Sequence, residues 1–373
     1  MRNLLIALLS VCTAILTWSG RMPETADPSK KDPFTVDTLY SRLRNPWGIT
    51  WLPDGRALVT ERSGEILIFR DDRYTGQKVA GLPPVYQNGQ GGLMDIVLHP
   101  EYKKNGWIYI SYAKPGPGGG GTAIIRARLN GNRLTDIQTI FQARPLSASG
   151  AHFGCRMVFD KNGYLYFSIG ERGTKPNSQT LANDLGKIHR VHDDGRIPAD
   201  NPFAKRQGAR GTIWSYGHRN PQGMAYDAEN DRIWAHEHGP KGGDELNLIQ
   251  KGKNYGWPVT TYGIDYNGDI ISKLKEKEGI ENPVHYWVPS IGPCGMTLVT
   301  SDRYPRLKGG LLIGALALTH VSHVKLRGTR FAGEEKLLNN VGRVRQVAQS
   351  PDGYIYLLTE GRGMLLKLIP TKA

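Results

Sequence analysis

The sequence predicts an all-β protein, built as a six-bladed β-propeller with four-stranded antiparallel blades. Three observations lead to this fold class. One phrase, an apolar run followed by an Asp/Asn-Gly turn and an alternating aromatic and β-branched strand, recurs along the chain. Its turns lie near residues 55, 106, 163, 230, 309 and 353, a period of very roughly 50–60 residues with insertions in the middle, which fits propeller blades. Glycine (46) and proline (23) are abundant among the 373 residues, which favours many turns over a helical bundle.

Five copies of the phrase have the regular pattern of a hairpin. The paired strands are 48–55 with 57–60, 95–100 with 107–112, 157–160 with 164–169, 224–227 with 232–235, and 347–353 with 354–358. A sixth, less regular copy covers 306–324. Because a single hairpin buries too little surface to be stable, about six of them must close radially to make a core. A β-sandwich is the alternative.

The two ends of the chain are expected to close the ring, with residues 34–39 pairing beside the last strands near 365–369. One domain then covers residues 34–373. Ahead of it, Arg2 and the apolar run from Leu4 to Trp18 are typical of a secretory signal peptide over residues 1–20, followed by a flexible linker over 21–33. An uncleaved anchor is the alternative, although this run is shorter than the roughly 20 residues that a membrane span requires. We expect an exported protein, periplasmic or secreted, with no stable membrane span in the mature chain.

The charge balance narrows the choice of partners. Lys and Arg number 48 against 34 Asp and Glu, and the formal net charge of +14 attracts anions of any kind. The basic residues are dispersed and no nucleic-acid-binding motif is present, so we expect no nucleic acid partner. A basic surface that docks an acidic partner or an anionic membrane accounts better for the charge, and predicts an association that salt weakens.

Two glycine-rich segments carry candidate functional side chains. Gly89-Gln-Gly-Gly-Leu-Met-Asp95 places the amide of Gln90 in a loop whose backbone can approach a flat ligand closely. Gly150-Ala-His-Phe-Gly-Cys-Arg156 places His152 just before a strand, where an imidazole can face the central cavity and act as a general base. A lone loop histidine is also often structural or merely exposed, so this motif alone leaves both interpretations open.

Three further segments offer charged groups. Tyr216-Gly-His-Arg-Asn-Pro-Gln-Gly-Met224 presents Arg219 and Asn220, donors suited to a carboxylate or quinone oxygen. His236-Glu-His-Gly-Pro-Lys-Gly-Gly-Asp-Glu-Leu-Asn247 combines carboxylates with Gly/Pro turns whose oxygens suit Ca²⁺; zinc on its two histidines is the weaker alternative. Arg343-Val-Arg345 places two guanidinium groups on one face of a strand, suited to a polyanionic small molecule, with a basic surface strand as the alternative.

Taken in order, these motifs resemble the soluble quinoprotein glucose/sorbosone dehydrogenase family, and most closely its bacterial aldose sugar dehydrogenase branch. The resemblance runs from about Tyr40 to Pro370. It rests on Gly89-Gln-Gly-Gly-Leu-Met-Asp95, His152-Phe-Gly154 with Arg156, Tyr216-Gly-His-Arg-Asn-Pro-Gln-Gly223, Glu237-His-Gly-Pro-Lys-Gly-Gly-Asp-Glu245, Lys253-Asn-Tyr-Gly-Trp-Pro258 and Arg343-Val-Arg345. The resemblance implies a six-bladed propeller that holds pyrroloquinoline quinone (PQQ) with Ca²⁺ in a central cleft and oxidises aldose sugars outside the cytoplasm.

The resemblance also implies roles for individual residues. His152 would remove the proton from the anomeric hydroxyl while a hydride passes from C1 to the quinone, and Arg219 would stabilise the charge that develops on the quinone oxygen. Electrons would then pass to an external acceptor, a quinone or a cytochrome. The implied cofactor ligands are Gln90, Arg219, Asn220, Arg343 and Arg345, with Tyr266 lining the same cleft. The implied Ca²⁺ ligands are the main-chain carbonyls of Gly239 and Pro240, and Glu245 and Tyr255 match positions that bind a further, structural Ca²⁺.

Two departures from the family pattern concern the cleft. In Gly314-Ala-Leu-Ala-Leu-Thr-His320 the family commonly has a basic residue where this chain has Ala317, which would remove one cofactor contact and weaken PQQ binding. Cys155 and Cys294 stand where relatives usually carry glycine or another small residue. These two cysteines remain after the leader and exclude a Cys-x-x-Cys site; a disulfide between them is an open alternative.

Two other functions stay open on sequence grounds. A calcium-dependent lactonase on a similar propeller would use a histidine and Ca²⁺ to activate water, but it would not need Arg343 and Arg345. An exported propeller that binds without catalysis is the other. Ala317 favours this binding scaffold, whereas the retention of His152 with Arg219 and Asn220 speaks against it.

Overall fold

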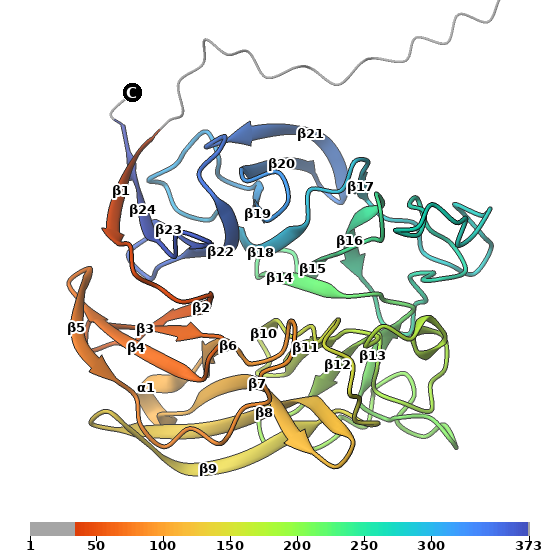
Figure 1. Cartoon of the computed structure of the whole chain (residues 1–373), viewed down its shortest axis with the longest axis horizontal. Helices are drawn as coiled ribbons and strands as arrows, with labels where there is room; N and C mark the ends of the chain where they lie inside the picture. The colour runs from red at the N-terminus through yellow and green to blue at the C-terminus, as the bar shows by residue number, and fades with distance from the viewer. Residues whose placement is uncertain (1–33, 372–373) are drawn as a thin grey trace, which may run out of the picture.

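The computed structural model describes residues 34–371, which form six four-stranded antiparallel sheets arranged around a central axis (Figure 1). Within these residues the helices are the short α1 (Tyr102–Asn105) and η1 (Lys175–Ser178). The predicted six-bladed propeller is therefore confirmed, and the sandwich alternative is excluded. The predicted signal peptide and linker lie outside the described residues. No helix in the described part of the chain is long and apolar enough to cross a membrane.

The first three blades follow one another along the chain, each with its strands in chain order from the axis outward. Blade 1 contains β2 (Pro46–Trp51), β3 (Arg56–Glu61), β4 (Glu65–Arg70) and β5 (Arg73–Lys78). Blade 2 contains β6 (Leu93–Leu98), β7 (Ile108–Gly116), β8 (Gly119–Asn130) and β9 (Arg133–Gln142). Blade 3 contains β10 (Met157–Phe159), β11 (Leu165–Ile169), β12 (Lys187–Val191) and β13 (Ile213–Tyr216).

The last three blades repeat this order, and the sixth joins the two ends of the chain. Blade 4 contains β14 (Pro221–Asp227), β15 (Arg232–Glu237), β16 (Asp244–Ile249) and β17 (His285–Trp287). Blade 5 contains β18 (Pro293–Leu298), β19 (Leu311–Ala315), β20 (Val321–Arg327) and β21 (Arg330–Leu337). Blade 6 contains β22 (Arg343–Gln349), β23 (Ile355–Glu360), β24 (Leu365–Pro370) and β1 (Phe34–Tyr40). β1 pairs antiparallel with β24, with Phe34 opposite Pro370, which confirms the predicted closure.

The hydrophobic core is divided among the spaces between neighbouring blades. Between blades 2 and 3, for example, Met94 and Tyr109 pack with Met157 and Phe167, and all four side chains are buried. Burial of such a side chain stabilises the fold by about 1.5–3 kcal/mol. The alternation of apolar residues in the recurring phrase therefore becomes the set of contacts that holds each blade against the next.

Arg156 closes the axis of the ring and contacts every blade. It directly precedes β10 in blade 3, and its side chain is buried. Its partners, one from each of the other blades, are the Trp47 ring, the Asp95 carboxylate, the carbonyls of Gln222 and Arg345, and the Cys294 thiol. This one guanidinium therefore separates the two faces of the propeller at their centre.

The strand order also determines where the loops gather. Each blade has four antiparallel strands, so the chain leaves a blade at the same face at which it entered. The six inner strands therefore all begin at one face and end at the other. We call the face where they begin, at residues 46, 93, 157, 221, 293 and 343, the top face, and the other the bottom face. The connectors that lead into each blade and the turns between its second and third strands lie at the top face.

Candidate active site

The residues predicted for the site come together at the top face. Gln90 and His152 lie in the connectors that lead into blades 2 and 3, and Arg219 and Asn220 lie in the connector that leads into blade 4. The turn between β15 and β16 contributes Gly239 and Pro240, and β22 contributes Arg343 and Arg345. Residues that are up to 255 positions apart thus share one face because each blade begins there.

His152 is held in place through its main chain. Its N–H donates to Gln90 Oε1 at 2.9 Å, and the N–H of Gln90 donates to Gly150 O at 2.7 Å. Glycine is required at position 89, because a Cβ there would lie 2.4 Å from the Gly150 oxygen. His152 has φ of 53°, in the left-handed region that non-glycine residues seldom adopt. Gln90 therefore acts in this structure on the loop that carries the imidazole.

Glu171 is the partner of the His152 side chain, and sequence reasoning did not find it. The imidazole Nδ1 forms a hydrogen bond with Glu171 Oε1 in the turn between β11 and β12, and this carboxylate is 1% exposed. Since an ionised carboxylate only accepts, Nδ1 carries the proton and Nε2 keeps its lone pair. A neutral imidazole with a free Nε2 is the state that a general base requires.

The surroundings of His152 favour this neutral state. Burial lowers the pKa of His152, and the positive charges of Arg219 and Arg172 lower it further, whereas the hydrogen bond and charge of Glu171 raise it. The net direction is downward, so the imidazole is unprotonated at neutral pH. The base is lost only as the pH falls through this lowered pKa.

Arg219 lies between the loops of blade 4 and two aromatic rings. Its Nη1 donates to Gly239 O at 2.6 Å, and its guanidinium carbon lies 5.2 Å from the Trp257 ring centroid and 6.0 Å from that of Tyr266. Tyr266 belongs to the long connection between β16 and β17 and is 69% exposed. The structure thus places Tyr266 near Arg219.

Asn220 offers a hydrogen-bond donor that the fold leaves unused. Its Oδ1 accepts from Gly154 N and from Gln222 Nε2, both at 3.2 Å. Its Nδ2 is buried and has no hydrogen-bond partner among residues 34–371. A buried amide donor without a partner costs about 1–3 kcal/mol. The donor is therefore available to a ligand that brings an oxygen.

The turn that carries Gly239 and Pro240 is fixed by Asp244. The Asp244 Oδ1 accepts from Gly239 N at 2.8 Å and from Ser290 Oγ at 3.0 Å. The Gly239 carbonyl accepts from Arg219, and the Pro240 carbonyl has only a long contact of 3.4 Å with Ser290 Oγ. Carbonyl oxygens of this kind are the hard ligands that Ca²⁺ prefers.

Glu245 lies near a second buried carboxylate, Glu237. Burial and the negative charge of Glu237 raise the pKa of Glu245 well above its usual value. The Asn247 amide donates to both, at 3.5 Å to Glu237 and 3.2 Å to Glu245. In the described part of the chain no group of three or more His, Cys, Asp or Glu could hold a metal ion. A cation beside this pair would therefore also need main-chain or water oxygens.

The hydroxyl of Tyr255 is not free to bind a metal. It donates to Leu248 O at 2.6 Å and accepts from Gln250 N at 2.8 Å, and the ring stacks on His218 at 4.7 Å. Burial raises the pKa of this phenol. Only the main-chain carbonyl of Tyr255 therefore remains as a ligand for the predicted structural Ca²⁺.

Arg343 and Arg345 share one partner, Glu360 of β23. Arg345 Nη2 lies 2.6 Å from Glu360 Oε1 and is buried, whereas Arg343 Nε lies 3.6 Å from Oε2 and its side chain is 50% exposed. The shared partner agrees with the predicted placement on one face. Arg345 Nη1 also contacts Gln222 Oε1 and the Cys294 sulfur, both at 3.1 Å. Arg343 is therefore the one of the two that can meet a ligand directly.

The disulfide between Cys155 and Cys294 is not formed, and both are free, buried thiols. Burial raises the pKa of the Cys155 thiol. The neutral form of Cys155 is therefore favoured, which makes this thiol a poor nucleophile.

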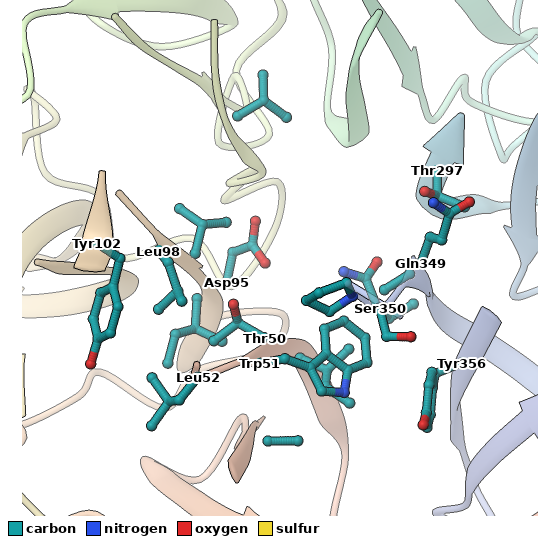
Figure 2. A pocket seen from close by; sticks show the side chains of 18 of the residues that line it. Thr50, Trp51, Leu52, Asp95, Leu98, Tyr102, Thr297, Gln349, Ser350 and Tyr356 are labelled. Atoms are coloured by element: carbon teal, nitrogen blue, oxygen red, sulfur yellow. The ribbon is translucent and has the colours of Figure 1, made fainter. Parts of the chain in front are cut away.

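A cavity of about 1560 Å³ opens at the bottom face (Figure 2). Figure 2 shows Trp51 and Tyr356 on its wall, with Thr50, Asp95 and Gln349. Arg156 and Asp95 separate it from the top face at the axis. None of the predicted site residues lines this cavity. The large cavity therefore lies at the bottom face, whereas the predicted site residues lie at the top face. The base, the unused amide donor and the paired carboxylates lie at the top face.

Comparisons with known proteins identify the family of this chain. The model of the Glucose / Sorbosone dehydrogenase family matches residues 43–367, nearly the whole propeller. The chain belongs to the glucose/sorbosone dehydrogenase family.

The following relatives each match over 90% or more of this chain. The aldose sugar dehydrogenase YliI of Escherichia coli is 43% identical over 96% of both chains. The crystal structure of the soluble aldose sugar dehydrogenase from Escherichia coli, in the apo-form, has a TM-score of 0.88 at 41% identity and covers 91% of this chain and 100% of its own. The PQQ-bound aldose sugar dehydrogenase from Streptomyces coelicolor has a TM-score of 0.75 at 28% identity, over 90% of this chain and 98% of its own.

The departure from the family pattern at Ala317 lies at the top face. Ala317 is exposed in the turn between β19 and β20. Arg343 Nη1 donates to the carbonyl of the preceding residue, Leu316, at 2.9 Å. A longer basic side chain at position 317 would therefore extend from the same turn that Arg343 contacts.

Proposed function

We propose that this member of the glucose/sorbosone dehydrogenase family is an exported, PQQ- and Ca²⁺-dependent enzyme that oxidises the C1 hydroxyl of aldose sugars to the lactone. The observation that carries the proposal is the hydrogen bond between His152 Nδ1 and the buried Glu171 carboxylate, which leaves Nε2 to act as the base. The placement of His152 in a connector at the top face, among unused donors, is what a base acting on a bound ligand requires.

The donors at the top face fit PQQ, whose carboxylates and quinone oxygens all accept hydrogen bonds. Asn220 brings its unused Nδ2, and Gln90 retains its amide N–H groups after its oxygen has accepted from His152. Arg219 and the half-exposed Arg343 bring positive charge. Arg345 is already paired with Glu360, so we expect it to hold that carboxylate, together with Gln222 and Cys294, in place beneath the cofactor.

The carbonyls of Gly239 and Pro240 would hold the Ca²⁺ next to the cofactor. The carboxylates of Glu245 and Glu237, with the carbonyl of Tyr255, would hold the structural Ca²⁺, because a cation removes the repulsion between the two acids. When bound, PQQ supplies the quinone that accepts the hydride leaving C1, and Ca²⁺ supplies a Lewis acid.

Residues of the chain itself accept the proton of the C1 hydroxyl. His152 Nε2 takes the proton of the C1 hydroxyl as the C1–H bond breaks and the lactone C=O forms. Glu171 keeps Nδ1–H in place and stabilises the imidazolium that results. The aromatic rings of Tyr266 and Trp257 lie beside the Arg219 guanidinium and limit its contact with water.

Steady-state assays of the purified chain test the proposal. Oxidation of glucose and other aldoses with an artificial electron acceptor is expected only after addition of both PQQ and Ca²⁺, and removal of Ca²⁺ by a chelator is expected to abolish it. Hydrolysis of a sugar lactone without PQQ would instead favour the lactonase, and the absence of both activities would favour the binding scaffold.

Glu171→Gln is expected to lower kcat at least 10-fold and to move the acid limb of the pH profile to lower pH. The reason is that the Glu171 carboxylate raises the pKa of His152, so its removal lets that pKa fall. The pH dependence of kcat/KM for an aldose measures the shift. Glu335→Gln, which breaks an ion pair with Arg306 in blade 5, serves as control. An unchanged acid limb in Glu171→Gln would contradict the assignment.

Ala317→Lys is expected to tighten PQQ binding about fivefold, which corresponds to about 1 kcal/mol from one charge-assisted contact at a partly exposed site. Equilibrium titration with PQQ measures the dissociation constant. Ala228→Lys adds the same charge at the bottom face, in the turn between β14 and β15. Equal tightening by both variants would show that net charge, and not position 317, decides the affinity.

The cellular setting completes the proposal. The leader-like residues 1–20 support export to the periplasm or the medium, and the net charge of +14 supports docking of an acidic acceptor. Electrons would leave the reduced cofactor for an external quinone or cytochrome.

A further inference from the structure

Arg172 is a buried guanidinium beside the candidate base, and its hydrogen bonds have no part in the roles described above. Its side chain is 1% exposed and lies 3.5 Å from the centroid of the Phe153 ring. Nε donates to Ala151 O at 2.8 Å, Nη1 to Gly120 O at 2.9 Å, and Nη2 to Ser149 O. All three nitrogens thus donate to main-chain carbonyls, and the face of the group is covered by an aromatic ring.

These contacts join three separate parts of the top face. Ser149, Ala151 and Phe153 surround His152 in the connector into blade 3, and Gly120 lies in β8 of blade 2. Arg172 itself lies in the turn between β11 and β12, next to Glu171. The same turn therefore holds the loop of His152 through Arg172 and binds its imidazole through Glu171.

The backbone at Arg172 makes this double contact possible. Its φ is 61°, in the left-handed region, as is the φ of 53° at His152. That conformation costs a non-glycine residue about 1 kcal/mol, so it persists only where surrounding contacts impose it. Here the conformation directs Glu171 and Arg172, neighbours in sequence, to two different parts of one loop.

The charge of Arg172 has a second effect at the same place. Burial lowers the pKa of Arg172 to about 10, so the guanidinium stays charged at neutral pH. The groups that act on the charge of His152 are Glu171, which favours imidazolium, and Arg219 and Arg172, which oppose it; those that act on Arg172 are Tyr86 and Glu171. A neutral side chain of the same length would keep neither the three hydrogen bonds nor the opposing charge.

We infer that Arg172 is a positioning residue for His152: its guanidinium fixes the loop at Ser149 and Ala151, and its positive charge opposes protonation of the imidazole. The inference rests on the proposed function in so far as His152 is the base. Glu171 and Arg172 then act on the same imidazole in opposite directions: Glu171 favours its protonated form, and Arg172 opposes it.

Titration of the His152 ring by NMR tests the inference without any cofactor. The full chain, labelled at its histidines and assigned with His152→Asn, is compared with Arg172→Met, Arg172→Lys and Glu171→Gln. Arg172→Met is expected to shift the midpoint of the His152 titration to higher pH, and Glu171→Gln to lower pH. Arg172→Lys keeps the charge but not the planar three-way contact, so its midpoint should lie between that of Arg172→Met and that of the unaltered chain.

Kinetics of the holoenzyme give the second readout. Arg172→Met should lower kcat at least 10-fold, with KM for the sugar changed less than about threefold, and should move the acid limb to higher pH. The matched control is Arg190→Met. Arg190 is also buried and lies 4.4 Å from the centroid of the Trp214 ring, but it contacts none of the site residues.

The outcomes separate this inference from the proposed function. A folded Arg172→Met chain with the same His152 midpoint as the unaltered chain overturns the inference, as does an equal shift in Arg190→Met. If Arg172→Met does not fold, an Arg172→Lys chain with the unaltered midpoint and unaltered kcat overturns it. If the chain binds no PQQ, the proposed function fails, while the NMR titration still decides on Arg172.

Discussion

Arg156→Met is expected to lower the free energy of unfolding by about 3–5 kcal/mol, because it removes a buried charge that holds all six blades at the axis. The guanidinium donates to Gln222 O and Arg345 O, each at 2.9 Å, and lies 3.3 Å from Asp95 Oδ1 and 3.9 Å from the Trp47 ring centroid. Methionine fills similar space but leaves these acceptors without their donor. Urea denaturation followed by tryptophan fluorescence measures the change.

A second replacement identifies the physical cause. Burial raises the pKa of Asp95, and the Arg156 charge opposes that rise, so Arg156→Met leaves a buried carboxylate without its counter-ion. Arg156→Met combined with Asp95→Asn should therefore cost less than Arg156→Met alone. Lys161→Met, which removes an exposed ion pair with Asp231, should cost no more than about 1 kcal/mol. A loss in Arg156→Met no greater than in Lys161→Met would show that Arg156 is dispensable at the axis.

His152→Asn is expected to lower kcat/KM for aldoses about 10²–10⁴-fold while PQQ binding and folding are retained. Asparagine preserves a polar side chain in the loop and the main-chain contact to Gln90, but it has no basic nitrogen. His192→Asn, at a half-buried histidine next to Tyr164 in blade 3, is the control. Steady-state kinetics with a saturating artificial acceptor check the result.

An activity in His152→Asn within threefold of the unaltered enzyme would remove His152 from the chemistry. Loss of PQQ binding in the same variant would instead assign His152 to the cofactor, which equilibrium titration distinguishes from a loss of turnover.

The propeller could be predicted because the inner two strands of a blade carry a repeated signal. β10 and β11, for instance, pair as the phrase required, with Met157 opposite Phe167. The outer strands gave no such signal, since strands such as β5 face solvent along nearly their whole length. Their residues need not be apolar, so their pattern resembles that of a loop.

The site could be predicted in part for a related reason. The connectors into the blades are rich in glycine and carry His152, Arg219 and Asn220, so these segments can be recognised from their amino-acid composition. Glu171 and Glu360 were not found because each has its role only through a contact with another part of the top face: Glu171 with His152, and Glu360 with two arginines of the neighbouring strand. The charged pair Glu171-Arg172, one residue after the buried strand β11, was the available signal.

The topology of the propeller also explains why the large cavity and the predicted site residues lie at opposite faces. A ring of strands leaves space at both ends of its axis, and Arg156 divides that space. The connectors into the blades and the turns between second and third strands gather at the top face, and such loops can vary without disturbing the sheets. The polar side chains that carry chemistry accordingly gather at the top face.

The most direct test of the proposed chemistry is a single turnover without oxygen or added acceptor. The chain is loaded with PQQ and Ca²⁺ and mixed with excess glucose, and the absorbance of the quinone is followed in a stopped-flow instrument. We expect reduction of one equivalent of bound PQQ, slowed at least 100-fold in His152→Asn and unchanged in His192→Asn. Bound PQQ that stays oxidised with every aldose offered, or that is reduced equally fast in His152→Asn, would contradict the proposal.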